Sequence, residues 1–323
     1  MKRTRILSLI CVIALLLTGC SAAQQPPTEV TIAMGFIPNV QFAPMYVAVE
    51  RGYFRDEGIE INLDYGMETD LLQRLASNEL RFVVGSGDQV ILARSHDLPV
   101  KYVANWYPHF PVCVVALDDS GIAAPGDLVG KTVGTPGLEG ASYIGWLAFL
   151  QQVGVSPEQV DLQVIGYTQV ASLTEGRVDA AIGYTLNEPI QLDAAGYETV
   201  VFYLDDYTQL ISNGLITNDQ TIKRDAKLVE KVVRAFTRGL QDTLDDPDAA
   251  FQTVRRVIPE MDDQTAELQR AVLDAAVELW RAEQLGQTAE ADWQASIDFM
   301  EELGLISEGL EPEDVYTNRF VAK

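Results

Sequence analysis

Cysteine, histidine and basic residues are scarce in this 323-residue chain. The cysteines are Cys11, Cys20 and Cys113, and the histidines are His96 and His109. So few thiols and imidazoles argue against zinc fingers, iron–sulfur clusters and a disulfide scaffold, and we predict no metal site and no cofactor. Only 23 Lys and Arg oppose 47 Asp and Glu, giving a formal charge of −24. This charge repels phosphate backbones and argues against nucleic-acid binding.

The first twenty residues have the pattern of a targeting segment. Three basic residues precede an apolar run over residues 6–17, which is too short for a membrane span. The run ends in Leu-Thr-Gly-Cys at residues 17–20, which resembles the lipobox of bacterial lipoproteins. The resemblance implies that residues 1–19 are a signal peptide and that Cys20 carries a lipid. The protein would then be anchored to the cell membrane, outside the cytoplasm. The alternative is an ordinary secretory peptide.

Cleavage before Cys20 would change the composition of the mature chain. It would remove three basic residues and no acidic ones, so the formal charge would fall to −27. Cys113 would be the only unmodified thiol, and its apolar surroundings predict a buried strand residue. Residues 20–28 are small, polar and contain proline, which is typical of a flexible tether.

Strand-like and helix-like patterns alternate from residue 30 onward, which predicts an α/β architecture with mainly parallel sheets. The expected strands are 30–36, 59–65, 80–84, 100–104, 112–117, 132–135, 160–165, 178–182 and 199–203. Helical periodicity appears over 42–50, 71–76 and 143–152. After residue 223 only amphipathic helices are expected, over 227–244, 248–257, 264–282 and 289–303.

Two polar, turn-rich stretches divide this pattern into lobes. They span residues 118–126 and 204–208, on either side of the second strand–helix series. We therefore expect a first lobe formed by 29–117 and 206–323, and a second lobe formed by 118–205. A ligand would lie in the cleft between them. The alternative is a single large sheet.

A set of short motifs then appears in a characteristic order. They are Pro38-Asn39, residues 43–48 (APMYVA), 50–54 (ERGYF) and 57–59 (EGI), Asp88-Gln89, residues 98–100 (LPV), Asp127-Leu128, Gly130-Lys131, Asp179-Ala180, Tyr184 and 187–189 (NEP). Together they resemble the substrate-binding proteins of ABC importers related to binders of thiamine pyrimidine precursors. The resemblance covers about residues 30 to 250. It implies a type II periplasmic-binding fold, two lobes that close about a hinge, and a membrane permease with its ATPase subunit as partners. Related proteins carry aliphatic sulfonates, nitrate, thiamine pyrimidines and, in one branch, riboflavin.

The loops expected to face the cleft carry aromatic and acidic residues but no Lys or Arg. Asp88, Glu139 and Glu188 would oppose an anionic ligand, although helix N-termini can supply some donors. Aromatic faces beside acceptor groups suit instead a neutral heteroaromatic ring that bears N–H or O–H donors. The candidate ligand-binding residues are Asn39, Phe42, Ser86, Asp88, Trp106, Tyr107, Glu139, Tyr143, Tyr167, Tyr184, Asn187 and Glu188.

Several of these candidates have structural alternatives. Asn39 could cap the helix that follows it, and Trp106 with Tyr107 could pack between the lobes. Ser86 and Asp88 could begin a helix, and Glu188 could cap one or brace the hinge. These alternatives remain open from sequence.

Two departures from the family pattern indicate the ligand: an Asp-Trp pair is missing, and the loop over residues 105–110 (NWYPHF) offers a large aromatic surface that suits a three-ring flavin. Pyrimidine binders of this family usually carry Asp-Trp immediately before Pro-Asn, whereas this chain has Phe36-Ile37. We therefore place riboflavin ahead of thiamine pyrimidine precursors, with an aliphatic sulfonate third. The related fungal pyrimidine synthase depends on a Cys-rich segment and an active-site His, and neither is evident here. We therefore expect a binding protein rather than an enzyme. The remaining alternative is a protein-binding adaptor that uses the acidic C-terminal helices.

Overall fold

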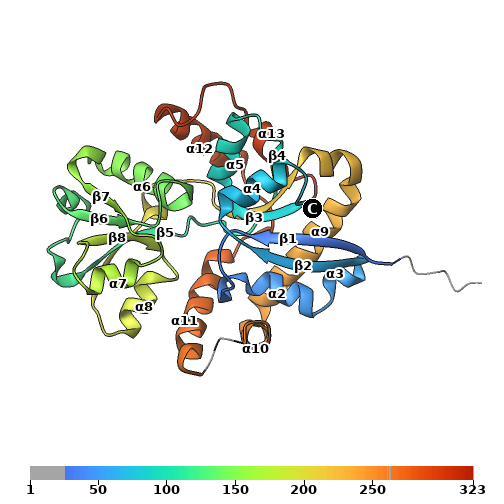
Figure 1. The fold of residues 1–323 in the computed structure, drawn as a ribbon, viewed down its shortest axis with the longest axis horizontal. Coiled ribbons are helices and arrows are strands. Elements are labelled where there is room, and N and C mark those ends of the chain that lie inside the picture. The colour runs from blue at the N-terminus through green and yellow to red at the C-terminus, as the bar shows by residue number, and fades with distance from the viewer. Residues whose placement is uncertain (1–25, 260, 262, 323) are drawn as a thin grey trace, which may run out of the picture.

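The computed structural model of the protein describes residues 26–259, 261 and 263–322. The expected signal peptide and Cys20 lie outside these residues. Two five-stranded sheets form separate lobes, which lie side by side in Figure 1. The first sheet has the order β2-β1-β3-β10-β4 and consists of Thr28–Met34 (β1), Ile59–Tyr65 (β2), Phe82–Ser86 (β3), Val100–Asn105 (β4) and Asn213–Asn218 (β10). The second has the order β7-β6-β8-β5-β9 and consists of Val112–Leu117 (β5), Thr132–Thr135 (β6), Asp161–Val164 (β7), Ala180–Tyr184 (β8) and Thr199–Tyr203 (β9).

One strand in each sheet runs against its neighbours. In the first sheet β1 pairs in parallel with β2 and β3, whereas β10 is antiparallel to β3 and β4. In the second, β6 pairs in parallel with β7 and β8, whereas β5 is antiparallel to β8 and β9. Both exceptions are the first strand after the chain crosses from the other lobe. Because that strand enters its sheet from the cleft side, it runs in the opposite direction. The sheets are therefore mixed.

The first crossover comes earlier in the chain than the sequence predicts. Strand β5 belongs to the second sheet, so assigning residues 112–117 to the first lobe is wrong. The crossing segment is 106–111, and the expected crossover at 118–126 forms two 3₁₀ turns, Asp118–Ser120 (η2) and Pro125–Leu128 (η3). The second crossover, which leads the chain back to the first lobe, starts where expected, at Leu204–Asp206 (η5) after β9. It leads into β10, which the sequence analysis does not predict. Thr28 also lies in β1 rather than in the expected tether.

Helices cover both sheets and extend the first lobe (Figure 1). Those that follow strands of the first sheet are Ala43–Glu50 (α2), Tyr53–Asp56 (α3), Glu68–Ala76 (α4) and Gly87–Ser95 (α5). The second lobe has Gly140–Val153 (α6), Gln169–Thr174 (α7) and Glu188–Ala194 (α8). The C-terminal part has Asp219–Asp245 (α9), Pro247–Val257 (α10), Asp263–Trp280 (α11), Glu290–Glu302 (α12) and Pro312–Val315 (α13). The predicted series of C-terminal helices is confirmed. Among the residues described, no helix is both long and apolar enough to cross a membrane.

The largest core cluster joins the first sheet to the C-terminal helices. Helix α2 is buried over residues 43–48 and packs against α9, whose apolar face includes Phe236. Trp280 of α11 lies in the same cluster as Trp106, so the C-terminal helices reach the base of the cleft. Burial of such apolar area is the main favourable contribution to folding.

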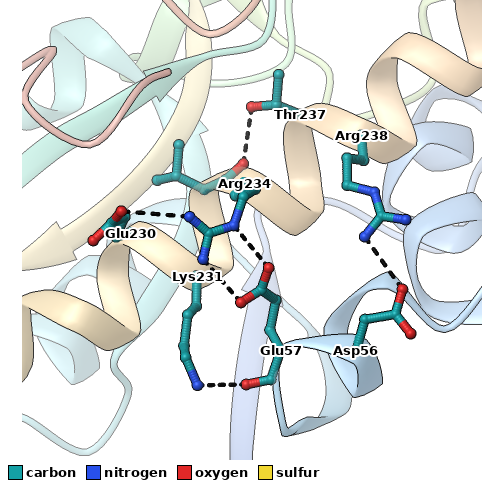
Figure 2. A network of polar contacts seen from close by, with 8 residues as sticks. Asp56, Glu57, Glu230, Lys231, Arg234, Thr237 and Arg238 are labelled. Carbon is teal, nitrogen blue, oxygen red and sulfur yellow. Dashed lines mark hydrogen bonds and ion pairs between the residues drawn. The ribbon is translucent and has the colours of Figure 1, made fainter. Parts of the chain in front are cut away.

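An ion-pair network on the outer surface fixes α3 to α9 (Figure 2). Arg234 donates to both carboxylate oxygens of Glu57, at 2.7 and 2.9 Å, and lowers the pKa of that carboxyl group. Lys231 Nζ donates to the Glu57 carbonyl oxygen at 2.5 Å, and Arg238 pairs with Asp56 at 3.2 Å. The arginines are well exposed, so each pair contributes no more than about 1 kcal/mol.

The two crossover segments are bonded to each other. Asp205 accepts hydrogen bonds from the backbone N–H of Phe110 at 2.9 Å and pairs with His109 Nδ1 at 3.0 Å. The backbone N–H groups of Trp106 and Tyr107 both donate to the carbonyl oxygen of Asn213, at 3.1 Å each. The outgoing and returning strands of the hinge therefore form one hydrogen-bonded unit.

Candidate functional site

A cavity of about 310 Å³ lies between the two lobes. Its walls come from segments that follow strands of both sheets, the arrangement that mixed α/β folds use to bind ligands. The walls consist of Gly35, Phe36, Gln41, Phe42, Met67, Glu68, Thr69, Val84, Gly85, Gln89, Trp106, Tyr107, Pro136, Gly137, Glu139, Gly140, Ala141, Ser142, Gly166, Tyr167, Gln169, Tyr184, Asn187, Glu188 and Asn213. None of these described lining residues is Lys or Arg, as predicted for the cleft loops, and none is His, although one of those loops contains His109.

The aromatic lining comes from both lobes. Trp106 is only 1% exposed and packs against Phe42, Phe236 and Trp280, with ring centroids 5.0 to 6.1 Å apart. Trp106 therefore packs in the core and also lines the cavity, so the two alternatives left open by the sequence do not exclude each other. Its Nε1–H is buried and has no hydrogen-bond partner among the described residues. A bound acceptor atom would satisfy this donor.

An aromatic contact joins the lobes at the cavity wall. Phe36 and Tyr167 meet edge to face, with centroids 5.2 Å apart and planes 79° apart. Phe36 follows β1 in the first lobe, and Tyr167 follows β7 in the second. Tyr167 is nevertheless 60% exposed, so this contact lies where the cavity reaches solvent. The structure is thus a form in which the two lobes touch across the site.

Carboxylates from the first lobe lie close together around Ser86. Glu68 Oε1 accepts from both the backbone N–H and the hydroxyl of Ser86, at 2.5 and 2.8 Å. Burial, helped by the nearby Asp88, raises the pKa of Glu68 to about 7. Asp88 is 3% exposed and accepts from Gln89 Nε2 at 3.1 Å, and burial raises its pKa as well. Two adjacent buried carboxyl groups cannot both ionise without a large cost.

In the second lobe Glu188 bonds to its own loop. One oxygen accepts from the backbone N–H of Tyr184 at 2.6 Å, and the other from Asn187 Nδ2 at 3.0 Å. Burial raises the pKa of Glu188. Glu139, by contrast, is exposed at the start of α6 and makes no cap hydrogen bond there.

The structure brings most of the predicted residues into one cavity. The predicted residues that line it are Phe42, Trp106, Tyr107, Glu139, Tyr167, Tyr184, Asn187 and Glu188. Four lie elsewhere. Asn39 caps the turn Val40–Phe42 (η1) by accepting from Gln41 N at 3.0 Å, and Tyr143 packs between two core clusters. Ser86 and Asp88 lie beneath the wall, where they contact Glu68 and Gln89.

The sequence analysis missed several polar lining residues. They are Gln41, Glu68, Gln89, Gln169 and Asn213. Glu68 lies just after β2, as the expected cleft loops lie just after other strands, so the strand pattern also points to this residue. Gln89 lies in a motif already noted. Asn213 begins β10, the strand that was not predicted, and its side-chain oxygen is buried without a partner among the described residues.

Comparisons with known proteins agree with this architecture. The model of the family described as NMT1/THI5 like matches residues 39–250. A riboflavin-binding protein, RibY, from Chloroflexus aurantiacus is 40% identical, with 99% of each chain covered. A formylaminopyrimidine-binding protein from Halalkalibacterium halodurans is 30% identical over 79% of each chain. A relative from Legionella pneumophila, 24% identical over 91% of this chain and 92% of its own length, is a 4-amino-5-hydroxymethyl-2-methylpyrimidine phosphate synthase.

Solved structures confirm the predicted fold class. The aliphatic sulphonate binding protein SsuA of Escherichia coli, a periplasmic protein, superposes with a TM-score of 0.73. The superposition covers 91% of this chain and 99% of SsuA, at 14% identity, so it shows the fold alone. On the family match and the relatives together, this chain belongs to the NMT1/THI5-like family and has the two-lobed fold of the periplasmic binding proteins.

Proposed function

We propose that this protein is the extracytoplasmic substrate-binding lipoprotein of an ABC importer and that it captures a neutral heteroaromatic vitamin, with riboflavin as the favoured ligand. The proposal rests mainly on the residues that line the cavity between the lobes. It combines aromatic rings with carboxamide and carboxylate groups and includes no Lys, Arg or His among the described residues. Rings stack on flat ligands, and these polar groups bond to N–H and carbonyl groups on a ring edge.

An anionic ligand fits this lining poorly. Sulfonate, nitrate or phosphate would meet the carboxylates of Glu68 and Glu139, and no described lining residue supplies a side-chain cation to offset them. The cavity volume of about 310 Å³ also lies in the range typical of pockets for larger organic ligands. A ligand as small as nitrate would leave part of that space unfilled. The likeness to SsuA therefore supports the fold and not a sulfonate ligand.

Riboflavin is preferred over a thiamine pyrimidine precursor for two reasons. The 40% identical relative, which matches over its whole length, is a riboflavin-binding protein. In addition, Phe36 stands where pyrimidine binders carry an acidic residue, and here its ring meets Tyr167 of the other lobe. A pyrimidine precursor remains the second candidate because the 30% identical relative binds formylaminopyrimidine.

An enzymatic role is disfavoured by the positions of the reactive side chains. Cys113 is fully buried in β5, and burial raises its thiol pKa well above the ordinary value. His109 lies in the crossover, paired with Asp205, and does not line the cavity. Neither residue is placed to act on a bound ligand, so a role like that of the synthase relative is not supported.

Transport would use the two lobes as a clamp. A ligand enters while the lobes are apart, closure stacks its rings between Trp106, Tyr107 and the second-lobe tyrosines, and the closed form docks on the membrane permease. Opening of the docked protein, driven by the ATPase subunit, releases the ligand inward. The lipid on Cys20 keeps the protein at the membrane surface.

Fluorescence titration of the mature chain, purified in mild detergent, tests this function. We expect riboflavin to bind with a Kd below about 1 μM, hydroxymethylpyrimidine more weakly, and taurine not at all. Tight binding of taurine alone would overturn the ligand class. Recovery of the ligand unchanged after release separates a binder from an enzyme.

A further inference from the structure

Glu68 has one carboxylate oxygen that the protein does not use. Oε1 accepts both hydrogen bonds from Ser86, and no donor among the described residues reaches Oε2. Glu68 lines the cavity, and its side chain packs over Gly85, where a Cβ would come within 2.7 Å of Oε1. The carboxylate is therefore held from one side, which leaves the other oxygen available to a ligand.

The hydrogen bonds around Ser86 fix which groups are satisfied. The Ser86 hydroxyl lies within reach of both carboxyl groups: it bonds to Glu68 Oε1 at 2.8 Å and also lowers the pKa of Asp88, but its one proton serves a single acceptor at a time. Asp88 Oδ1 is buried and has no partner among the described residues. Because two neighbouring buried carboxyl groups disfavour a second charge, one retained proton would leave about one negative charge, not two, beneath the cavity.

Across the cleft, Glu68 faces acidic and phenolic groups of the second lobe. The field of Glu68 contributes to the raised pKa values of Tyr167 and Tyr184, and Glu139 in turn raises the pKa of Glu68. Closure therefore brings a second-lobe carboxylate toward Glu68. A hydrogen-bond donor on the ligand, placed against Glu68, offsets this repulsion, whereas an acceptor there would add to it.

Glu188 of the second lobe differs from Glu68 in how its carboxylate oxygens are used. Both of its oxygens accept hydrogen bonds from its own loop, so Glu188 positions the second lobe's wall. Among the lining carboxylates of the described residues, Glu68 combines a fixed orientation with an unused oxygen.

We propose that Glu68 is a specificity-determining residue of the cavity: its Oε2 accepts a hydrogen bond from a ring N–H of the ligand, and this bond selects ligands that carry a donor on the ring edge. The inference rests on the proposed function and deepens it. For riboflavin the donor is the imide N–H at N3. A site built to accept a hydrogen bond rejects analogues that lack the donor.

The experiment compares riboflavin with N3-methylriboflavin, which lacks this N–H, on three forms of the mature chain in detergent. The forms are the wild type, Glu68→Gln and Glu68→Ala, with Glu79→Gln as an exposed control just beyond α4. In the wild type, methylation should weaken binding at least tenfold. Glu68→Gln, which turns a donor toward the ligand, should weaken riboflavin binding at least tenfold, and Glu79→Gln should not. In Glu68→Ala the methylation penalty should shrink to threefold or less.

Thermal unfolding of each variant, followed by circular dichroism, verifies that it is folded. An equal methylation penalty in the wild type and Glu68→Ala, or unchanged riboflavin binding by Glu68→Gln, would overturn the role of Glu68 and leave the proposed function intact. A wild type that binds neither riboflavin nor hydroxymethylpyrimidine would instead overturn the proposed function, and the inference with it.

Discussion

Glu68 in the first lobe and Glu188 in the second make the same contact on opposite sides of the cavity. Each carboxylate accepts the backbone N–H that ends a strand, Ser86 N at 2.5 Å and Tyr184 N at 2.6 Å. Each also packs over the glycine that comes before that N–H, Gly85 or Gly183. Both lobes thus hold an acid against the end of their third parallel strand. Of these two acids, Glu68 keeps an oxygen that no donor among the described residues reaches.

Replacement of Gly183 should disturb this contact. In Gly183→Ala the new Cβ would lie 2.3 Å from Glu188 Oε2, so the carboxylate must move and lose its bond to Tyr184 N. We expect a loss of about 1–3 kcal/mol in the free energy of unfolding, measured with urea. Gly137→Ala is the matched control, because a Cβ at that lining position meets nothing within 4 Å. Equal stability of the two variants would contradict the prediction.

Stability should depend on pH through Glu68. Burial and the neighbouring Asp88 raise the Glu68 pKa to about 7 from an ordinary value of 4.5. Between these values the unfolded chain has released the proton and the folded chain retains it, so the free energy of unfolding falls as pH rises. The total loss across this range is at most about 3.4 kcal/mol. Urea unfolding at pH 5, 6, 7 and 8 measures it, and Glu68→Gln should flatten the profile. A profile that is just as steep in the variant would assign the effect to other groups.

The same titration should affect ligand binding with the opposite sign. The groups that face Glu68 are Asp88, Glu139, Tyr167 and Tyr184, and the pKa values of both tyrosines are raised, so they stay neutral below pH 8. A ligand that donates to Oε2 favours the charged carboxylate, so riboflavin affinity should rise up to tenfold from pH 6 to pH 8. Isothermal calorimetry in two buffers of different ionisation heat should detect proton release on binding.

These contacts also show what the sequence could and could not predict. Most strands and the helical C-terminal part follow from the hydrophobic pattern. The aromatic lining, without Lys or Arg among the described residues, follows from the loops that the family resemblance places at the cleft. Strands β3 and β8 end two residues later than predicted, at Ser86 and Tyr184. Their last residues include glycines, which have low strand propensity. The glycines are needed there because a carboxylate from elsewhere in the chain packs over them, a long-range contact that no local pattern contains.

The predicted boundary between the lobes, after residue 117, is wrong for a related reason. Strand β5 reads as a buried apolar run that could belong to either sheet, and pairing with β8 and β9 decides between them. Strand β10 begins with Asn213 and Gly214, a pair typical of turns, so its start is hidden. Assignment of a crossover thus depends on which strands pair, which is set by tertiary structure.

Trp106 should contribute to binding through its unpaired Nε1–H. Trp106→Ala would remove a core side chain and lower the free energy of unfolding by about 3–5 kcal/mol. A loss of binding in this variant could therefore not be separated from a loss of folding. Trp106→Phe keeps the apolar packing against Phe236 and Trp280 and removes only the unsatisfied donor and part of the ring. We expect its stability to change by less than about 1.5 kcal/mol and riboflavin affinity to fall about five- to tenfold. Undiminished affinity would show that the ligand does not use this donor.

The contact between Phe36 and Tyr167 should control how long the ligand stays bound. It joins the lobes at the solvent side of the cavity, and Tyr167 is 60% exposed, so its removal leaves the cores intact. Edge-to-face ring pairs contribute about 0.5–1.5 kcal/mol, which corresponds to a roughly two- to tenfold faster dissociation in Tyr167→Ala with little change in unfolding. Stopped-flow displacement of bound riboflavin measures the dissociation rate. Tyr197→Ala, at an exposed tyrosine of the same lobe that is not part of the cavity lining, provides the control. If both variants release riboflavin at the wild-type rate, the ring contact does not hold the closed form together.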